Sequence, residues 1–379
     1  MGIDEKYFNE KVKNISFIQL KEGTDIALND YVISPSLPLP VITDNLLSQL
    51  SYVEAKNGIT IEKIIEGIIY LLGADVEFVY AGEYIKILEA YNKDIDKVIF
   101  TKGIDALEKN DLEKSGLYFR TYNSLFASVE GLFYYAMVLE ALSKEKFSKE
   151  KLDEGNSFLE ESTKILEEIL NTDSKFYPSY YKLGFHYKFY EQYVKAKLTW
   201  ENALSLDPDL LRKDEIRIEL ENIEYNYGME LAEIYLSNLN YSKAIETLVN
   251  MVPKFKTEWK IYYLLGMAYR GSGDNQASIE YFESALEINP LNLDIYNELG
   301  IAYFNEGDIL SAIEVFAKGI ESNNEDYRLY FNRGLGYLNI GQMDKGYSDI
   351  LKANSLNPGD ENIKNQLEVL KKYFNNNNN

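Results

Sequence analysis

The spacing of hydrophobic and polar positions changes along the chain. Over residues 16–41 the two kinds of residue alternate weakly and the segment ends in three prolines, which predicts extended chain or a short hairpin. From Leu210, apolar residues follow at helical spacing with no breaker until Gly228, which predicts one elongated helix, about four turns longer than usual. Residues 361–374 place their apolar positions on one helical face, which predicts a helix that caps the preceding structure.

Between these segments the pattern itself repeats every 34 residues. Gly266, Gly300 and Gly334 are spaced 34 residues apart, and a tyrosine follows each of them three positions later. A second small residue follows twelve positions after each glycine, and a bulky residue lies four positions beyond it. Two helices cross closely only where side chains are small, so each repeat is interpreted as a pair of packed helices. The same pattern is found around Gly184 and, with alanine in place of glycine, around Ala232.

Looser copies of the pattern extend toward the N-terminus. Ala136 and Ser162 fit the two small positions, but they are 26 residues apart, an excess of 14. The extra residues are highly charged, and we expect them to project into solvent as a loop or a helical extension. A copy around Gly103 precedes this one, and a degenerate copy is predicted around Gly67.

This spacing resembles the tetratricopeptide repeat, of a bacterial cytoplasmic type. The resemblance implies an all-α fold, a right-handed superhelical α-solenoid of helix-turn-helix repeats with a partly irregular N-terminal cap. The predicted organisation is an irregular segment followed by degenerate helical hairpins (1–95), divergent repeats (96–176), a regular array with one elongated helix (177–358), a capping helix (359–374) and a disordered asparagine tail (375–379).

Charge and composition narrow the function. The chain carries 39 Lys and Arg against 61 Asp and Glu, a formal net charge of −22, which disfavours phosphate backbones and anionic lipid surfaces as partners. Without cysteine there are no disulfides and no thiolate ligands. The charged N-terminus does not resemble a secretory signal, and charges interrupt the longest apolar stretch. We therefore expect a cytoplasmic protein that binds neither nucleic acid nor membranes.

The sequence offers little catalytic chemistry. His186 is the single histidine, so a solvent-edge or packing role is favoured over catalysis, and no metal or cofactor is expected. No phosphate-binding loop motif occurs. The enzymatic alternative is an α-helical toroid glycosidase acting through paired carboxylates, but the repeats of such enzymes are usually longer and less regular than 34 residues.

The resemblance places ligands in a concave groove lined by the first helix of each repeat. We therefore predict a non-enzymatic scaffold or adaptor that binds a partner peptide or helix there. The alternatives are an intracellular peptide-sensing regulator, and a groove filled by the chain's own elongated helix or N-terminal segment. The chain has isolated elements of the Lys, Asn and Arg set with which some family members grip a C-terminal carboxylate, but never the full set. The predicted groove residues are Tyr181, Phe185, Lys188, Phe189, Lys260, Tyr263, Met267, Arg270, Asn297, Ile301, Phe304, Arg328, Phe331 and Asn332.

Overall fold

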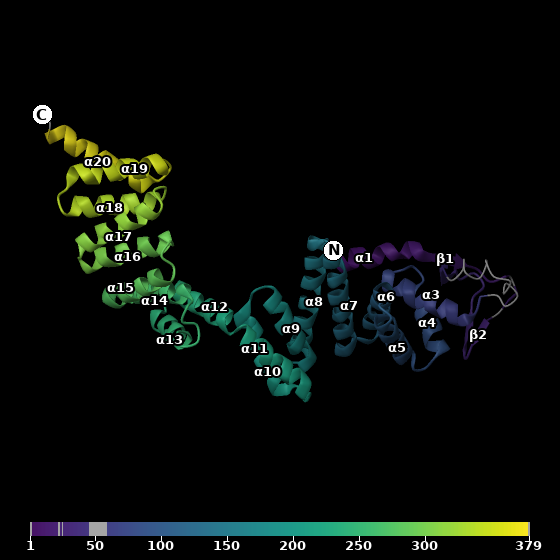
Figure 1. Cartoon of the computed structure of the whole chain (residues 1–379). Helices are drawn as coiled ribbons and strands as arrows, with labels where there is room; N and C mark the ends of the chain where they lie inside the picture. Colours follow the sequence, from purple (N-terminus) through teal and green to yellow (C-terminus); the bar gives the residue numbers. More distant parts are fainter. Residues whose placement is uncertain (1, 22, 25, 45–58, 378–379) are drawn as a thin grey trace. The chain divides into compact units, whose positions relative to one another are not determined.

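The computed structural model describes residues 2–21, 23, 24, 26–44 and 59–377. It is almost entirely helical and divides into two compact units, Met1–Arg217 and Ile218–Asn379, which we describe separately (Figure 1). None of the helices in these ranges has both the length and the apolar character needed to cross a membrane.

Unit 1 begins with short elements that cover its first long helix. These are α1 (Ile3–Asn9), the 3-10 helix η1 (Glu10–Asn14), and the strands β1 (Ile15–Ile18), β2 (Ile26–Leu28), β3 (Tyr31–Ile33) and β4 (Leu39–Ile42). Strand β1 pairs antiparallel with β4, and β2 forms a hairpin with β3. The segment predicted as extended chain or a hairpin thus contains both.

The remaining elements of unit 1 are helices that pack mostly in successive pairs. They are α3 (Ile61–Ala74), α4 (Ala81–Tyr91), α5 (Ile95–Glu108), α6 (Leu112–Phe126), α7 (Val129–Ser148), α8 (Leu152–Thr172), α9 (Tyr177–Phe189), α10 (Tyr193–Leu206) and the first part of α11 (Leu210–Asn222).

Helix α3 departs from the predicted pairing. A β-carbon on Gly67 would lie 2.1 Å from the carbonyl oxygen of Pro40, so the absent side chain lets the backbone of β4 approach. Helix α3 packs chiefly on β4 and α6 rather than on α4. The copy expected around Gly67 is therefore a helix that supports the N-terminal strands, and not one half of a repeat.

The looser copies around Gly103 and Ala136 have the geometry of true repeats. The Ser115 hydroxyl donates to the Gly103 carbonyl at 2.8 Å, and the Ser162 hydroxyl donates to the Ala136 carbonyl at 2.8 Å. Both serines are fully buried, so each bond pins the crossing point of two helices in an apolar core.

The 14 extra residues of the Ala136 copy lengthen α7 and α8, so the helical extension is found and the loop is not. The extension is partly covered, because α1 lies against α8. The ring of Tyr7 meets that of Phe158 edge to face at 5.5 Å, and Lys146 Nζ lies 5.4 Å from the centre of the Tyr7 ring. One face of this charged segment is thus packed rather than fully solvated.

The predicted elongated helix is wrong in one respect: it is two helices. Helix α11 ends at Asn222, and α12 (Glu224–Ser237) begins after Ile223. At Ile223 the backbone angles are φ −92° and ψ −1°, outside the α-helical range, and the side chain is buried. No proline or glycine marks this position, so helical periodicity gave no sign of the break.

Unit 2 is a stack of helical pairs closed by a final helix. Its elements are α12, α13 (Tyr241–Met251), α14 (Trp259–Ser272), α15 (Asn275–Ile288), α16 (Leu293–Glu306), α17 (Ile309–Ser322), α18 (Tyr327–Asn339), α19 (Met343–Leu356) and α20 (Glu361–Asn377). Two of the turns within pairs use glycine in the left-handed region, Gly273 (φ 90°) and Gly307 (φ 91°). The aspartate after each caps the next helix, with Asp274 accepting from the Ala277 amide at 3.0 Å.

The core of unit 2 forms where a bulky side chain lies on a glycine. A β-carbon on Gly266 would lie 2.6 Å from the ring of Phe282, and one on Gly300 would lie 2.3 Å from the ring of Phe316. Both rings are fully buried. These are the residues that the 34-residue spacing assigned to the crossing, so the packing reason for the pattern is confirmed.

The first helices of the pairs form the inner face of unit 2. Successive first helices α12, α14, α16 and α18 contact one another, and successive second helices make fewer such contacts. A stack whose elements crowd on one side curves toward that side. The face lined by the first helices, which we call the inner face, is therefore the concave one.

Candidate functional site

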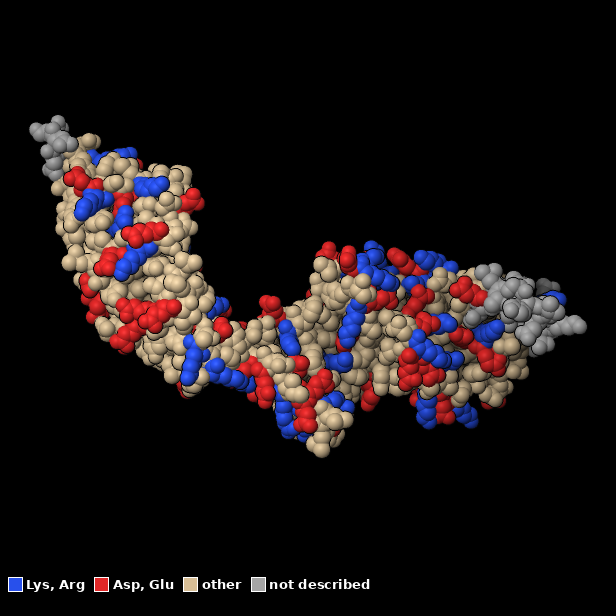
Figure 2. Space-filling model, viewed as in Figure 1, with Lys and Arg blue, Asp and Glu red and all other residues tan. Residues whose placement is uncertain are grey.

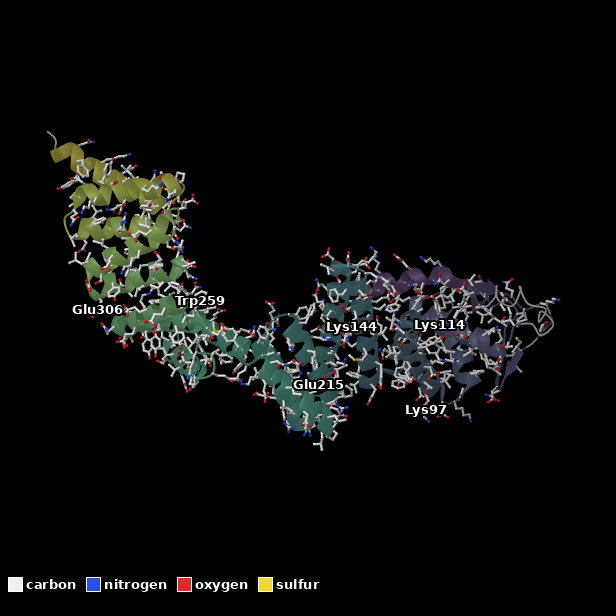
Figure 3. The ribbon with its side chains drawn as sticks, viewed as in Figure 1. Lys97, Lys114, Lys144, Glu215, Trp259 and Glu306 are labelled. Atoms are coloured by element: carbon white, nitrogen blue, oxygen red, sulfur yellow. The ribbon has the colours of Figure 1, made fainter. Side chains whose placement is uncertain are left out.

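Unit 1 contains a cavity of about 400 Å³ between α7, α9 and the start of α11. Its walls are mainly apolar, and its polar side chains gather on the side formed by α7 and α9. Figure 3 labels two members of the lining, Lys144 on α7 and Glu215 on α11. The full lining is Glu140, Ser143, Lys144, Phe147, Leu159, Tyr181, Lys182, Phe185, His186, Phe189 and Glu215.

Aromatic rings form most of the apolar wall. Phe147 and Phe189 lie 5.6 Å apart between ring centres, and Tyr181 and Phe185 lie 5.2 Å apart in an edge-to-face contact. Behind them Phe185 meets the buried ring of Trp200 at 5.1 Å. The wall is therefore braced by the helix-crossing core, which fixes its shape.

The polar side of the cavity centres on Glu140, which is 8% exposed. Its carboxylate receives Lys144 at 2.5 Å and Lys182 at 3.1 Å, and His186 Nε2 lies 3.5 Å from its Oε2. Burial acts to raise the pKa of the Glu140 carboxyl, but His186 and the two ammonium groups hold that pKa well below its usual value of 4.5. Glu140 is thus a carboxylate whose charge is balanced inside the fold.

His186 is buried, with 4% exposure, and does not lie at the solvent edge. Its Nδ1 lies 2.9 Å from the Thr163 hydroxyl on α8, and its other nitrogen faces Glu140 on α7. The imidazole therefore joins three helices, which is a packing role. No hydroxyl nucleophile lines the cavity within this network except Ser143, whose proton is donated to the Gly155 carbonyl at 2.8 Å.

The inner face of unit 2 carries a ladder of polar side chains that crosses three first helices. Arg270 on α14 contacts Glu298 on α16 at 2.5 Å. The Asn297 amide donates to Glu298 at 3.1 Å, and the Asn332 amide on α18 donates to Asn297 at 2.8 Å. Neighbouring repeats are thereby joined through side chains that also face the groove.

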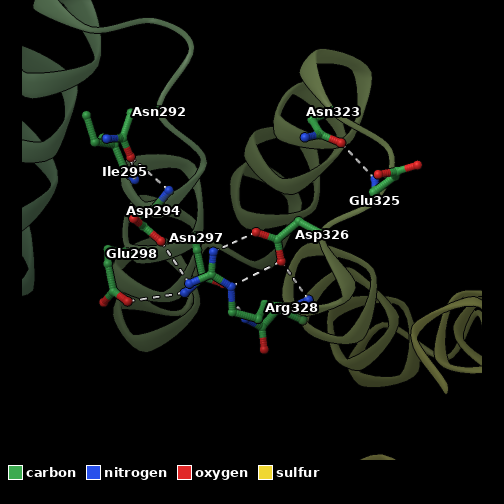
Figure 4. Close-up of polar contacts among 10 residues, drawn as sticks. Asn292, Asp294, Ile295, Asn297, Glu298, Asn323, Glu325, Asp326 and Arg328 are labelled. Atoms are coloured by element: carbon green, nitrogen blue, oxygen red, sulfur yellow. Dashed lines mark hydrogen bonds and ion pairs between the residues drawn. The ribbon is translucent and has the colours of Figure 1, made fainter. Parts of the chain in front are cut away.

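A second set of contacts closes the end of this ladder, as Figure 4 shows. Arg328 on α18 donates to Asp294 on α16 at 2.8 Å and to Asp326 at 2.6 Å. The guanidinium counteracts burial, and the pKa of the Asp326 carboxyl is lowered below its usual value of 3.8. Its charge is therefore taken up within unit 2.

Apolar side chains lie between these polar groups. Tyr263, Met267 and Arg270 line a shallow cavity of about 350 Å³ beside Leu236 of α12. Burial raises the pKa of the Tyr263 hydroxyl to about 12, so this phenol stays neutral at physiological pH. Farther along the stack Ile301, Phe304 and Phe331 are half-buried and pack beside the core clusters of their repeats.

The structure divides the predicted groove residues between the two units. Tyr181, Phe185 and Phe189 meet around the cavity of unit 1, with Lys188 on the same helix. The residues predicted from Lys260 to Asn332 lie on the first helices of unit 2. The elements of a carboxylate grip do not converge, because Lys260 pairs with Glu233 at 2.9 Å while Arg328 and Asn332 are engaged as described above.

Sequence reasoning missed Glu140 and its neighbours. Glu140 lies four positions after Ala136, which is one of the inward positions of a first helix, so the signal was present in the Ala136 copy. Acidic residues are abundant along the chain, and nothing in the sequence singled out this one. In the described ranges no cluster of His, Asp and Glu side chains could hold a metal ion.

Comparison with known proteins identifies the repeat. Residues 263–345, from α14 into α19, match the family model described as tetratricopeptide repeat. The chain is a tetratricopeptide-repeat protein, as the 34-residue spacing predicts. No curated protein matches the chain.

Solved structures that resemble the chain share its repeats at low identity. YrrB, described as a TPR protein with an unusual peptide-binding site, is 17% identical over 54% of this chain and 97% of its own, with a TM-score of 0.38. MamA is 22% identical over 56% of this chain and 93% of its own, with a TM-score of 0.31. The first TPR domain of Spaghetti (RPAP3), bound to the HSP90 peptide SRMEEVD, is 16% identical over 31% of this chain and 93% of its own, with a TM-score of 0.30.

Proposed function

We propose that the protein is a non-enzymatic interaction scaffold that holds a peptide or helix of a partner protein on the inner face of unit 2. The observation that carries this proposal is the composition of that face. Half-buried apolar side chains, among them Met267, Ile301 and Phe304, alternate with polar groups that are already paired with one another. Such a face can bury apolar anchors without leaving a charge unpartnered.

The pairing of the polar groups also favours a particular kind of partner. Arg270, Glu298 and Arg328 are each engaged within the unit, so a strongly charged peptide would have to break existing contacts. An amphipathic segment with apolar anchors at helical spacing would keep them. We therefore favour an uncharged apolar stripe on the partner over a carboxylate tail.

The same proposal places the protein in the cytoplasm and excludes nucleic acid as its main partner. The net charge of −22 disfavours phosphate backbones, and Figure 2 shows acidic and basic side chains interspersed over the visible face of unit 1 rather than gathered in a basic block.

The test begins with selection of binders from a random peptide library displayed on phage. The affinity of a selected peptide is then measured for the unaltered chain and for the double variant Met267→Ala/Phe304→Ala. We expect the double variant to bind at least about tenfold more weakly, because two apolar anchors lose their contact surface.

Leu310→Ala supplies the matched control. Leu310 is 69% exposed on α17, a second helix, so its truncation removes apolar surface outside the inner face. Circular dichroism confirms that both variants are folded. The proposal fails if binding survives in the double variant, or if Leu310→Ala weakens binding to the same extent.

A further inference from the structure

We propose that the cavity of unit 1 is a binding site for an indole ring, the side chain of a tryptophan in a partner peptide. This inference goes beyond the proposed function and does not depend on it, since every residue of the cavity lies in unit 1. Three features of the lining specify the ligand: the wall, the balance of charge and one buried acceptor.

The wall specifies a flat apolar group. Phe147, Phe185 and Phe189 present ring faces and edges, and Leu159 adds an aliphatic surface. The Phe189 side chain is 52% exposed although it lies beside a cavity that it could help to close. A bound aromatic ring would remove that surface from water and contact several rings at once.

The balance of charge excludes an ionised group in the cavity. Lys144 and Lys182 both pair with Glu140, and Glu215 accepts a hydrogen bond from the Tyr181 hydroxyl at 2.6 Å. The lining thus has two ammonium groups and two carboxylates, and each is already engaged. A buried carboxylate or ammonium on the ligand would have no partner of its own and would lose its hydration.

One acceptor in the lining remains without a hydrogen bond. Glu140 Oε2 is buried and receives none, and Lys182 Nζ and His186 Nε2 lie 3.1 and 3.5 Å away without hydrogen-bond geometry. This oxygen needs a donor that brings no further charge. The indole N–H is a donor with no acceptor of its own, so it fits both the wall and the free oxygen.

The rim favours a residue of a peptide over free indole. Lys144 is 72% exposed at its side chain, and with Glu215 it places one donor and one acceptor at the edge of the cavity. Main-chain amide groups on either side of a bound tryptophan could use both. The volume of about 400 Å³ also leaves room for the carbon that joins the ring to a backbone.

The experiment uses the full chain and three small probes, N-acetyl-tryptophanamide, its 1-methylindole analogue and free indole. Binding is measured by ligand-observed NMR titration. We expect saturable binding of N-acetyl-tryptophanamide and about tenfold weaker binding of the methylated analogue, which cannot donate to a charged acceptor. Free indole should bind more weakly than N-acetyl-tryptophanamide because it cannot use the rim.

Two variants locate the site. Phe189→Ala should weaken N-acetyl-tryptophanamide binding about tenfold, because it removes one aromatic wall. Leu198→Ala, a truncation at a side chain that is 56% exposed on α10, should leave it unchanged. Equal binding of the methylated analogue would overturn the role of Glu140. Binding of free indole as tightly as N-acetyl-tryptophanamide would overturn the peptide as the source, and no effect of Phe189→Ala would overturn the site.

Discussion

The indole ring of Trp200 lies on the α-carbon of Gly184, so close that a β-carbon on residue 184 would be 2.1 Å from Trp200 Nε1. The ring nitrogen donates to the Tyr181 carbonyl at 3.3 Å, which holds the ring in the crossing between α9 and α10. A ring on a glycine recurs at Gly266 and Gly300 in unit 2. The crossing, rather than the surface of the helices, therefore fixes where each repeat is closed.

Gly184→Ala should destabilise the protein. A methyl group cannot fit without moving a ring that is fully buried, and overpacking of this kind costs about 1–3 kcal/mol in the free energy of unfolding. Urea unfolding followed by circular dichroism measures the change. Gly82→Ala is the control, since nothing lies within 4 Å of its β-carbon position and alanine favours the helix. A cost at Gly82 equal to that at Gly184 would contradict the packing argument.

Ser278→Ala should destabilise unit 2 by about 1 kcal/mol, the usual net worth of a buried hydrogen bond. The Ser278 hydroxyl is fully buried and donates to the Gly266 carbonyl at 2.8 Å, at the crossing of α14 and α15. Ser284→Ala is matched in chemistry but removes an exposed bond to Glu280 within one helix. Unfolding of the two variants in urea should differ, and equal stabilities would show that the buried bond contributes nothing.

The 34-residue spacing predicted the pairs of helices, the glycine crossings and the residues of the inner face because each of these depends on local periodicity and side-chain size. It could not predict the break at Ile223, where a tertiary contact decides the backbone and no proline or glycine announces it. It also missed α3, because the partner of Gly67 is β4, a strand distant in sequence.

Polar partners were the other limit of the sequence. Glu140 became notable only when folding brought Lys182 and His186 to it from 42 residues or more along the chain. Burial of the three groups is a property of the packed helices α7, α8 and α9. No pattern within a single repeat contains it.

The stability of unit 1 should depend on pH through Glu140. The pKa of this carboxyl is lowered on folding from 4.5, so the folded state binds a proton less readily than the unfolded state. Its contribution is therefore fully present above pH 4.5 and is lost as the pH falls toward the folded pKa. We expect the difference in unfolding free energy between the unaltered chain and Glu140→Gln to shrink between pH 6 and pH 3.

Urea unfolding at several pH values measures this difference, and subtraction of the variant removes the contribution of other acidic residues. Glu62→Gln is the control, because Glu62 lies on the surface of α3, far in sequence from the cavity. A difference for Glu140→Gln that stays constant from pH 6 to pH 3, or that matches the control, would contradict the linkage.

Arg333 stands where two other repeats have leucine, at positions 265 and 299, and the structure shows why the fold accepts it. Its guanidinium binds Asp349 in a bidentate contact, with Nε at 2.7 Å and Nη2 at 2.9 Å. Asp349 is 8% exposed, and the residue 34 positions earlier is Val315. The arginine and the aspartate together thus replace an apolar pair.

Arg333→Leu should therefore cost about 2 kcal/mol, because it leaves a buried carboxylate unpaired, and the double variant Arg333→Leu/Asp349→Val should recover most of that loss. Asp349→Val alone should cost less, since the longer arginine side chain can turn toward water. Urea unfolding of all four proteins closes the double-mutant cycle. If the double variant is as unstable as the sum of the single variants, the two residues are not coupled and the explanation of the exchange is wrong.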